Sequence, residues 1–206
     1  MSVYNGERFL RESVDSLLTQ TYQNLEIIVV NDGSQDRSRD IMATYKDERI
    51  VRIDRSKNIG LTKSLNEGLR HAHGEYIARL DAGDIAFPSR IEEQVLFLRQ
   101  HAEIGILGSG IALLSNGGQT LREYVYVSDH EAIEKQLLHF MNPLPHSTLM
   151  FRRKVLEQLN GYCTAFVRSQ DYDLLLRALK ITKLSSLSRV LVRLRFDPLS
   201  LSYGST

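Results

Sequence analysis

The sequence has little cysteine and no apolar run long enough to cross a membrane. Cys163 is the only cysteine among 206 residues, which excludes an intrachain disulfide and is typical of a reducing compartment. No basic segment followed by an apolar run opens the chain, and the most apolar stretch, residues 104–114, is interrupted by glycine and serine and is too short for a bilayer. These absences predict a cytoplasmic protein that is neither secreted nor membrane-spanning.

An excess of charge of one sign is also missing. The 26 basic and 25 acidic residues leave a formal net charge of +1, so the molecule has no overall field that would gather nucleic acid or acidic membranes. The sequence therefore predicts no nucleic-acid partner, and any ligand has to be argued from individual sites.

Two common nucleotide-binding motifs are absent. No glycine-rich phosphate loop ending in Lys-Ser or Lys-Thr occurs, and no Gly-x-Gly-x-x-Gly follows the first predicted strand. This argues against P-loop hydrolases and ordinary dinucleotide oxidoreductases. A sugar nucleotidyltransferase is disfavoured too, because no glycine-rich, lysine-containing opening loop is present to hold a nucleoside triphosphate.

The apolar spacing predicts strands and helices that alternate through residue 80, which is typical of a parallel sheet covered by helices. Beyond residue 104, two strands flank an Asn116-Gly117 turn, so the second half adds antiparallel strands. We expect helices near residues 10–18, 38–45, 62–72, 88–98, 129–139, 152–159 and 171–180, and strands near residues 25–30, 50–53, 76–80, 104–114, 120–127 and 146–151. Without repeats or linkers, the chain is predicted to be a single α/β domain over residues 1–206, with subregions that meet near residue 115 and with both ends truncated.

Polar residues follow a short opening strand at residues 2–4 and the predicted strands near residues 25–30 and 76–80, at the places where an open parallel sheet binds its ligands. The three loops are residues 4–7, 31–34 and 81–84, and we expect them to line one crevice. Taken alone, each is also explained as a turn or helix cap. Asp81 and Asp84 are spaced to share Mg²⁺ or Mn²⁺ with a substrate diphosphate, yet acidic loops without metal are common. The occurrence of all three loops together favours a site.

These loops resemble family-2 glycosyltransferases of the GT-A fold. The segments that carry the resemblance are Tyr4-Asn5-Gly6-Glu7, residues 28–36 (Ile-Val-Val-Asn-Asp-Gly-Ser-Gln-Asp), Asn58-Ile59-Gly60 and residues 74–84 (Gly-Glu-Tyr-Ile-Ala-Arg-Leu-Asp-Ala-Gly-Asp). The similarity continues through residues 146–152, 169–174 and 195–198, so it covers nearly the whole chain. Together the segments are highly specific, whereas each alone is weak.

The resemblance implies an inverting glycosyltransferase that moves a sugar from a nucleoside diphosphate donor, with uridine as the base, to a hydroxyl acceptor in surface polysaccharide or glycolipid synthesis. It implies a GT-A type α/β fold, with a mostly parallel nucleotide-binding sheet flanked by helices and a smaller antiparallel acceptor-side part. Residues 1–114 would be the nucleotide-sugar-binding half, and residues 115–206 the acceptor and catalytic-base half.

The same resemblance implies roles for individual residues. Asp32 would contact the donor base, Tyr4, Asn5, Glu7 and Asn58 would help to form the nucleotide pocket, and Asp81 would meet ribose, diphosphate and metal. Asp171 would be the catalytic base, because inversion needs a carboxylate on the acceptor side to take the hydroxyl proton. From the residues alone, Asp171 at a helix start is also explained by the helix dipole, and Asp173 is the first alternative as base.

Basic residues and one histidine leave alternatives open. His146 can hydrogen-bond a diphosphate or have a structural role. Arg152 and Arg153 are interpreted as ordinary surface charges. Lys180, Arg189, Arg193 and Arg195 are interpreted as a solvated face rather than a membrane-facing stripe. Relatives with glycan or lipid-linked acceptors leave peripheral contact with the inner face of the membrane open, although these basic residues are too sparse to establish it.

Three departures from the family pattern bear on the implied Mg²⁺ or Mn²⁺ cofactor. Gly83 stands where many relatives have a metal-binding acid, Gln170 stands where glutamate is usual, and Asp197 replaces a histidine that often completes the metal site. The expected metal ligands are therefore Asp81, Asp84 and Asp197. The same departures motivate an alternative, a noncatalytic nucleotide-sugar-binding or scaffold domain.

Overall fold

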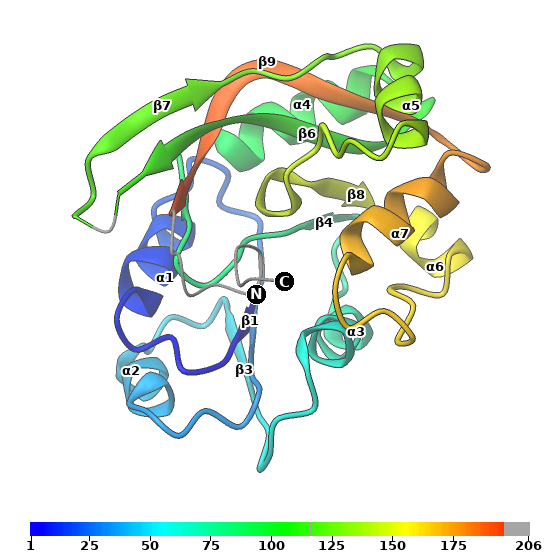
Figure 1. Ribbon diagram of the computed structural model, residues 1–206. Helices are drawn as coiled ribbons and strands as arrows, with labels where there is room; N and C mark the ends of the chain where they lie inside the picture. The colour runs from blue at the N-terminus through cyan, green and yellow to red at the C-terminus, as the bar shows by residue number, and fades with distance from the viewer. Residues whose placement is uncertain (116, 196–206) are drawn as a thin grey trace.

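The computed structural model describes residues 1–115 and 117–195 (Figure 1). The helices are α1 (Leu10–Leu18), α2 (Ser38–Thr44), α3 (Leu61–His71), α4 (Arg90–Gln100), α5 (His130–Leu138), a short 3₁₀ turn η1 (His146–Thr148), α6 (Arg153–Gln158) and α7 (Gln170–Ala178). The strands are β1 (Ser2–Val3), β2 (Ile27–Asn31), β3 (Ile50–Asp54), β4 (Tyr76–Ala78), β5 (Ile85–Ala86), β6 (Ile104–Leu114), β7 (Thr120–Tyr124), β8 (Met150–Arg152) and β9 (Lys183–Arg195). No described helix is both long enough and apolar enough to cross a membrane.

A small parallel sheet is formed by the first strands in the order β1-β2-β3. β2 is a run of branched apolar residues that is buried almost throughout, as expected for a strand with both faces covered. Helices α1 and α2 lie beside this sheet in Figure 1. The cluster between them consists of Val3, Leu10, Val14, Ile27, Val29 and Met42.

A second, mixed sheet has the order β4-β8-β6-β9-β5, with β7 paired to β6. Strands β6 and β9 run parallel to each other, whereas the other pairs are antiparallel. Figure 1 shows β6 and β9 crossing one side of the molecule, with α5, α6 and α7 gathered at one end. The largest apolar cluster packs these helices on the sheet, and it includes Ile106, Ile133, Leu137, Phe151, Leu174 and Leu184.

The structure confirms the expected α/β class and most elements, and it corrects three details. The sequence pattern does not predict β9, although it is a long strand that lies between β6 and β5. The pattern places β4 with the parallel strands, but β4 pairs antiparallel with β8. Residues 146–148 form the turn η1 instead of the expected extended segment. The helix expected near residues 129–139 is α5, and the Asp129 carboxylate caps it by accepting from the Ala132 N–H at 2.8 Å.

A cavity of about 580 Å³ separates the two sheets. Residues of β2, β4 and α3 line it. Arg79 and Arg90 also line it, and among the described residues Arg79 Nε and Nη1 and Arg90 Nη1 have no hydrogen-bond partner.

Candidate active site

The loops that follow β1 and β2 are interlocked by hydrogen bonds between side chains and main chain. The N–H of Asn5 donates to Ser34 Oγ at 3.0 Å, and Asn5 Oδ1 accepts from the N–H of Gln35 at 2.9 Å. Glu7 Oε2 in turn accepts from the N–H of Arg37 at 2.9 Å. Asn5 and Glu7 thus hold the shape of this loop pair, while Tyr4 beside them is exposed.

Asp32 is only 2% exposed and holds the loop that precedes α3. Its two carboxylate oxygens accept from the N–H groups of Ile59 at 2.9 Å and Gly60 at 3.0 Å. Gly60 also donates to Asn58 Oδ1, and this glycine has a positive φ of 92°. Asp32 and Asn58 are therefore brought together, and both fix the start of α3.

We expect Asp32→Ala to lower the free energy of unfolding, because the Ile59 N–H loses its acceptor, at a cost of about 1–3 kcal/mol where it remains buried, and the Gly60 N–H keeps only Asn58 Oδ1. Thermal denaturation of this variant should show a midpoint several degrees below the parent. Glu48→Ala, at an exposed position, is the matched control and should leave the midpoint unchanged. An unchanged midpoint in Asp32→Ala would contradict the loop-holding role.

Asp81 and Asp84 lie on either side of Ser147, the residue after His146. Ser147 Oγ is 3.0 Å from Asp81 Oδ2 and 2.5 Å from Asp84 Oδ2, and it also accepts from the Asp81 N–H at 3.0 Å. One hydroxyl proton cannot be donated to both carboxylates at once, so a proton on one of the two acids would favour this arrangement. Burial and the neighbouring charge of Asp81 raise the pKa of Asp84 to about 7, which makes Asp84 the protonated member.

Arg79 keeps Asp81 in its charged form. The guanidinium is 4% exposed and forms an ion pair with the Asp81 carboxylate. Burial works to raise the pKa of Asp81, but the charge of Arg79 and the hydrogen bonds outweigh it and hold that pKa at about 2. The two acids thus have separated pKa values, as in sites where one carboxylate stays ionised and its neighbour carries a proton.

Arg195 clamps the same loop, which corrects the interpretation of this residue as part of a solvated face. It is buried at the end of β9, its N–H donates to Asp84 Oδ1 at 2.9 Å, and its Nε donates to the Gly83 carbonyl at 3.2 Å. Its guanidinium also pairs with Glu12 on α1. Arg152 likewise is not an ordinary surface charge, because its guanidinium donates to the carbonyls of Leu98, His101 and Ile104.

His146 is tied to Tyr162. Its Nε2 lies 2.8 Å from the Tyr162 hydroxyl, and the rings meet edge to face with centroids 5.5 Å apart. Burial and the charge of Arg79 lower the pKa of His146 to about 3, so the imidazole is neutral at physiological pH. Asn66 of α3 fixes Tyr162 in two ways, accepting from its N–H at 2.9 Å and donating to its carbonyl at 2.8 Å.

Asp171 lies in the first turn of α7, where its Oδ2 accepts from Asn142 Nδ2 at 3.1 Å. Burial raises the pKa of Asp171, and the negative charge of Asp81 adds to this. The charge of Asp81 therefore reaches Asp171. Asp173, two residues on, points elsewhere and pairs with Arg177 at 2.9 Å.

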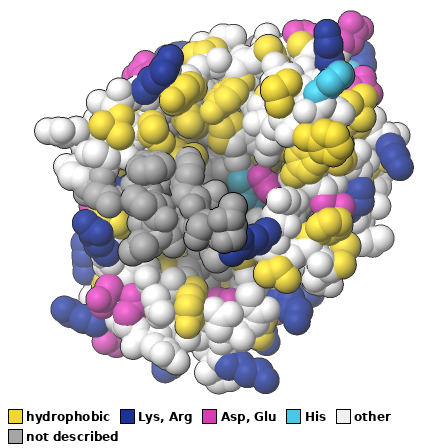
Figure 2. Space-filling view, viewed as in Figure 1, with side chains coloured by type: hydrophobic (Ala, Val, Ile, Leu, Met, Phe, Trp, Pro, Cys, Tyr) yellow, Lys and Arg dark blue, Asp and Glu magenta, His cyan; other side chains and the backbone are white. Residues whose placement is uncertain are grey.

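These contacts join the two parts of the site. Tyr162 lies within the electrostatic reach of Arg79, Asp171 and Asp81 together, and burial first of all raises its pKa. Asp32 connects to the same region through α3, because Thr62 Oγ1 donates at 2.8 Å to the carbonyl of Phe166 in the loop before α7. Figure 2 shows a histidine and an acidic side chain side by side in a hollow at the centre of this face.

The described residues contain no group of three His, Cys, Asp or Glu side chains placed to hold a metal ion. Of the expected ligands, Asp81 and Asp84 are together and Asp197 lies outside the described residues. Two neighbouring carboxylates joined by a hydroxyl are hard oxygen ligands that suit a divalent cation shared with a diphosphate. The donor set therefore fits Mg²⁺ or Mn²⁺ as a partial site.

Several residues that shape the site were not predicted from the sequence. These are Arg79, Ser147, Tyr162, Asn66 and Asn142, all hydrogen-bonded to the predicted acids or to His146 or Tyr162. Arg79 and Ser147 lie inside segments that carry the family resemblance, so that similarity was the available signal. Asn66 and Asn142 sit in segments without such a signal.

The arrangement is an α/β domain with a pair of acids after β4 and a third, separate acid at the start of α7. Solved structures with this fold include S. aureus TarS 1-349 in complex with UDP-GlcNAc, with a TM-score of 0.80, 18% identity, and coverage of 100% of this chain and 60% of that one. The mannosyltransferase PcManGT from Pyrobaculum calidifontis, in complex with GDP-Man and Mn²⁺, has a TM-score of 0.69, 20% identity, and coverage of 94% and 55%. At these identities the likeness establishes the fold, which is of GT-A type.

The chain belongs to glycosyl transferase family 2, whose model matches residues 1–160. Curated relatives include the putative glycosyltransferase EpsE of Bacillus subtilis, 37% identical, with 86% of this chain and 64% of the relative covered. The O-antigen biosynthesis glycosyltransferase WbnJ of Escherichia coli is 32% identical, with 87% and 70% covered. The chain spans less than two thirds of the length of several curated relatives, for example 64%, 33% and 63% of three of them.

Proposed function

We propose that this domain is an inverting glycosyltransferase that transfers a sugar from a nucleoside diphosphate donor, UDP-linked, to a hydroxyl acceptor in surface polysaccharide or glycolipid synthesis. The observation that carries the proposal is that Asp81 and Asp84 share the Ser147 hydroxyl, while Asp171 is a separate acid at the start of α7 whose pKa is raised by burial first and also by the charge of Asp81. An inverting transfer needs the leaving diphosphate on one side of the anomeric carbon and the base for the attacking hydroxyl on the other.

On the acceptor side, Asp171 takes the proton of the attacking hydroxyl. Asn142 orients it through the hydrogen bond at 3.1 Å, and this bond leaves the other carboxylate oxygen for the acceptor. The raised pKa makes Asp171 a stronger base than an ordinary surface aspartate. Residues 115–206 form the acceptor half in this scheme, and residues 1–114 the donor half.

On the donor side, the loops that carry Tyr4, Asn5, Glu7 and Asp32 receive the nucleotide. Support comes from the interlocked hydrogen bonds that shape these loops at the carboxyl ends of β1 and β2. The relatives with bound UDP, UDP-GlcNAc and GDP-Man share this fold, and UDP is the donor nucleotide that we favour.

Asp81 and Asp84 would hold Mg²⁺ or Mn²⁺ here. Such an ion, when bound, supplies positive charge that stabilises the departing diphosphate. The chain's own residues prepare this place: Ser147 bridges the two acids, and Arg195 fixes the loop through Asp84 and Gly83.

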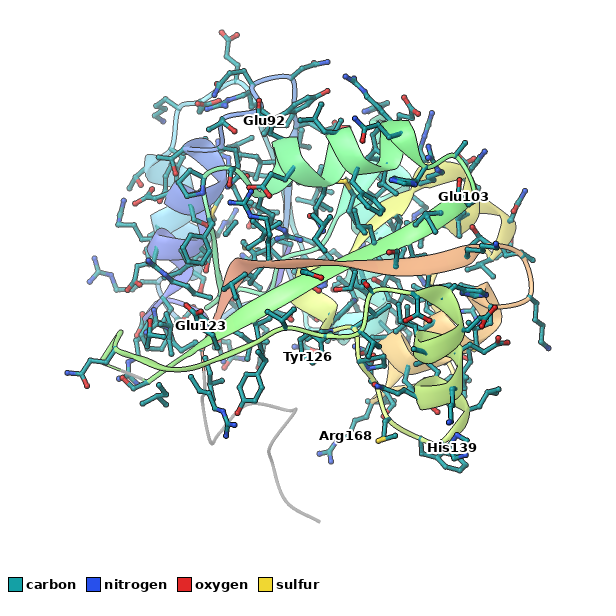
Figure 3. All side chains as sticks on the ribbon, turned by 90° about the horizontal axis from the view of Figure 1, so that it is seen from above. Glu92, Glu103, Glu123, Tyr126, His139 and Arg168 are labelled. Carbon is teal, nitrogen blue, oxygen red and sulfur yellow. The ribbon has the colours of Figure 1, made fainter. Side chains whose placement is uncertain are left out.

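The acceptor is glycan or lipid-linked, and exposed apolar side chains beside Asp171 favour contact with the inner face of the membrane. This acceptor-side rim consists of Leu138, Phe140, Met141, Phe166 and Val167. Phe140 is 89% exposed and has a positive φ of 61°, a conformation that costs a bulky residue about 1–3 kcal/mol. Figure 3 shows His139 and Arg168 projecting at the same corner, so the guanidinium of Arg168 accompanies the rim, as basic side chains do at anionic lipid surfaces.

The proposal is tested by incubating the protein with UDP-, GDP- and dTDP-sugars and Mn²⁺, and measuring nucleoside diphosphate release with and without candidate acceptors. We expect release that depends on both a UDP-sugar and an acceptor. Donor binding by calorimetry without any release across the panel would instead favour a noncatalytic nucleotide-sugar-binding domain.

A further inference from the structure

The hydroxyl of Tyr162 makes its one described hydrogen bond to His146 Nε2, at 2.8 Å. A phenol is the more acidic partner, and a hydroxyl that accepted from Nε2 would have to place its own proton on another acceptor. No such acceptor is found among the described residues, and the hydroxyl is buried. Tyr162 therefore donates to Nε2, and the ring proton of the neutral imidazole is on Nδ1.

The Nδ1–H group is available to a ligand. It has no described hydrogen bond, and His146 is partly exposed. His146 immediately precedes Ser147, which touches both Asp81 and Asp84. A neutral donor next to the two acids is suited to an oxygen of a diphosphate, because it adds a hydrogen bond without another full charge.

Asn66 and the turn at Gly161 hold Tyr162 in place. Asn66 bonds both its N–H and its carbonyl, and Gly161 before it has a positive φ of 67°. A Cβ at Gly161 would lie 2.6 Å from Asn66 Oδ1, so only glycine allows this close approach. The turn is thus fixed to α3, the helix whose first residues are positioned by Asp32.

We infer that Tyr162 is a positioning residue that sets the Nδ1–H tautomer of His146, and that His146 Nδ1–H donates a hydrogen bond to the leaving diphosphate. This inference rests on the proposed glycosyl transfer for its second part. The first part, the tautomer, concerns the free protein and is independent of any activity.

The tautomer is read from ¹⁵N chemical shifts of His146 in histidine-labelled full chain, assigned by comparison with His146→Ala. We expect a protonated Nδ1 and an unprotonated Nε2 in the parent protein, and a shift toward the Nε2–H form in Tyr162→Phe. Tyr45→Phe removes a hydroxyl that bonds Asp15 on α1 and is the matched control, with unchanged His146 signals. An unaltered tautomer in Tyr162→Phe would overturn the inference.

Kinetics test the second part. We expect Tyr162→Phe to lower kcat about tenfold with the donor KM within threefold, and His146→Ala to lower kcat about a hundredfold. Adding Tyr162→Phe to His146→Ala should cause no further loss, because Tyr162 acts through His146. Effects that multiply would contradict this.

Conservative variants separate the two ring nitrogens. The amide nitrogen of asparagine occupies the place of Nδ1, and that of glutamine the place of Nε2. His146→Asn should therefore retain more transfer than His146→Gln, and the reverse order would overturn the assignment of Nδ1. If the parent protein turns over no donor at all, the proposed function fails, while the chemical shifts still decide the role of Tyr162.

Discussion

Asp171→Asn should abolish transfer while the donor still binds. A general base contributes about 10²–10⁴-fold to a rate, and an amide cannot accept the hydroxyl proton, so we expect kcat to fall about a thousandfold. The introduced amide keeps an oxygen for the hydrogen bond from Asn142, so the geometry of the loop should survive. Nucleotide release and calorimetric titration with UDP measure the two properties, and UDP affinity should stay within threefold.

Asp173→Asn is the matched control on the same helix. It loses the charge that pairs with Arg177, so its thermal midpoint should fall slightly while kcat stays within a few-fold. The opposite pattern, with transfer lost in Asp173→Asn and kept in Asp171→Asn, would show that the base has been misassigned.

The same assignment fixes the signs of two pH effects. Since the base works as a carboxylate, kcat should fall as pH drops through the pKa of Asp171, at a pH above the ordinary aspartate value of 3.8. A raised carboxyl pKa means that the folded state binds the proton more tightly than the unfolded chain, so stability falls as pH rises through that pKa. Asp171→Asn should therefore be at least as stable as the parent at neutral pH.

The parts of the fold that could be predicted are those whose signal is local. Branched apolar runs such as β2, and the Asp129 cap of α5, depend on neighbouring residues alone. β9 could not be recognised, because its arginines look like a solvated stretch until the partner strands are known. Arg195 becomes buried only because Asp84, Gly83 and Glu12 meet it there, from positions 111 to 183 residues away in the chain.

Some features of the site could likewise be predicted from local sequence, and others could not. Asp32, Asp81, Asp84 and Asp171 are acids at strand ends or helix starts, where the sequence pattern and the family resemblance both mark them. Their protonation states could not be predicted, because these depend on groups whose contacts form only in the fold, such as the ion pair of Arg79 with Asp81. The hydrogen bonds of Asp32 to the loop before α3 could not be predicted either, because no sequence pattern indicates them.

From the Asp81 and Asp84 pair we expect Mn²⁺ to displace a proton when it binds. Because the pKa of Asp84 is raised to about 7, this acid is mostly protonated at pH 6, and a metal ligand has to be deprotonated, so binding at pH 6 should release close to one proton. Calorimetry in two buffers with different ionisation enthalpies measures this release, which should become small at pH 8. The apparent affinity for Mn²⁺ should rise about tenfold per pH unit up to pH 7 and then level off.

Asp84→Asn should remove the proton release and weaken Mn²⁺ binding about a hundredfold, because one of two carboxylates is lost and the other stays paired with Arg79. Asp47→Asn is the control: this surface acid, whose hydrogen bonds with Arg49 first of all lower its pKa to about 2, is already ionised at pH 6. Binding at pH 6 without proton release in the parent would show that Asp81 and Asp84 do not share a proton. Retained affinity in Asp84→Asn would place the cation elsewhere, since Asp84 is the proposed ligand that gains a charge on binding.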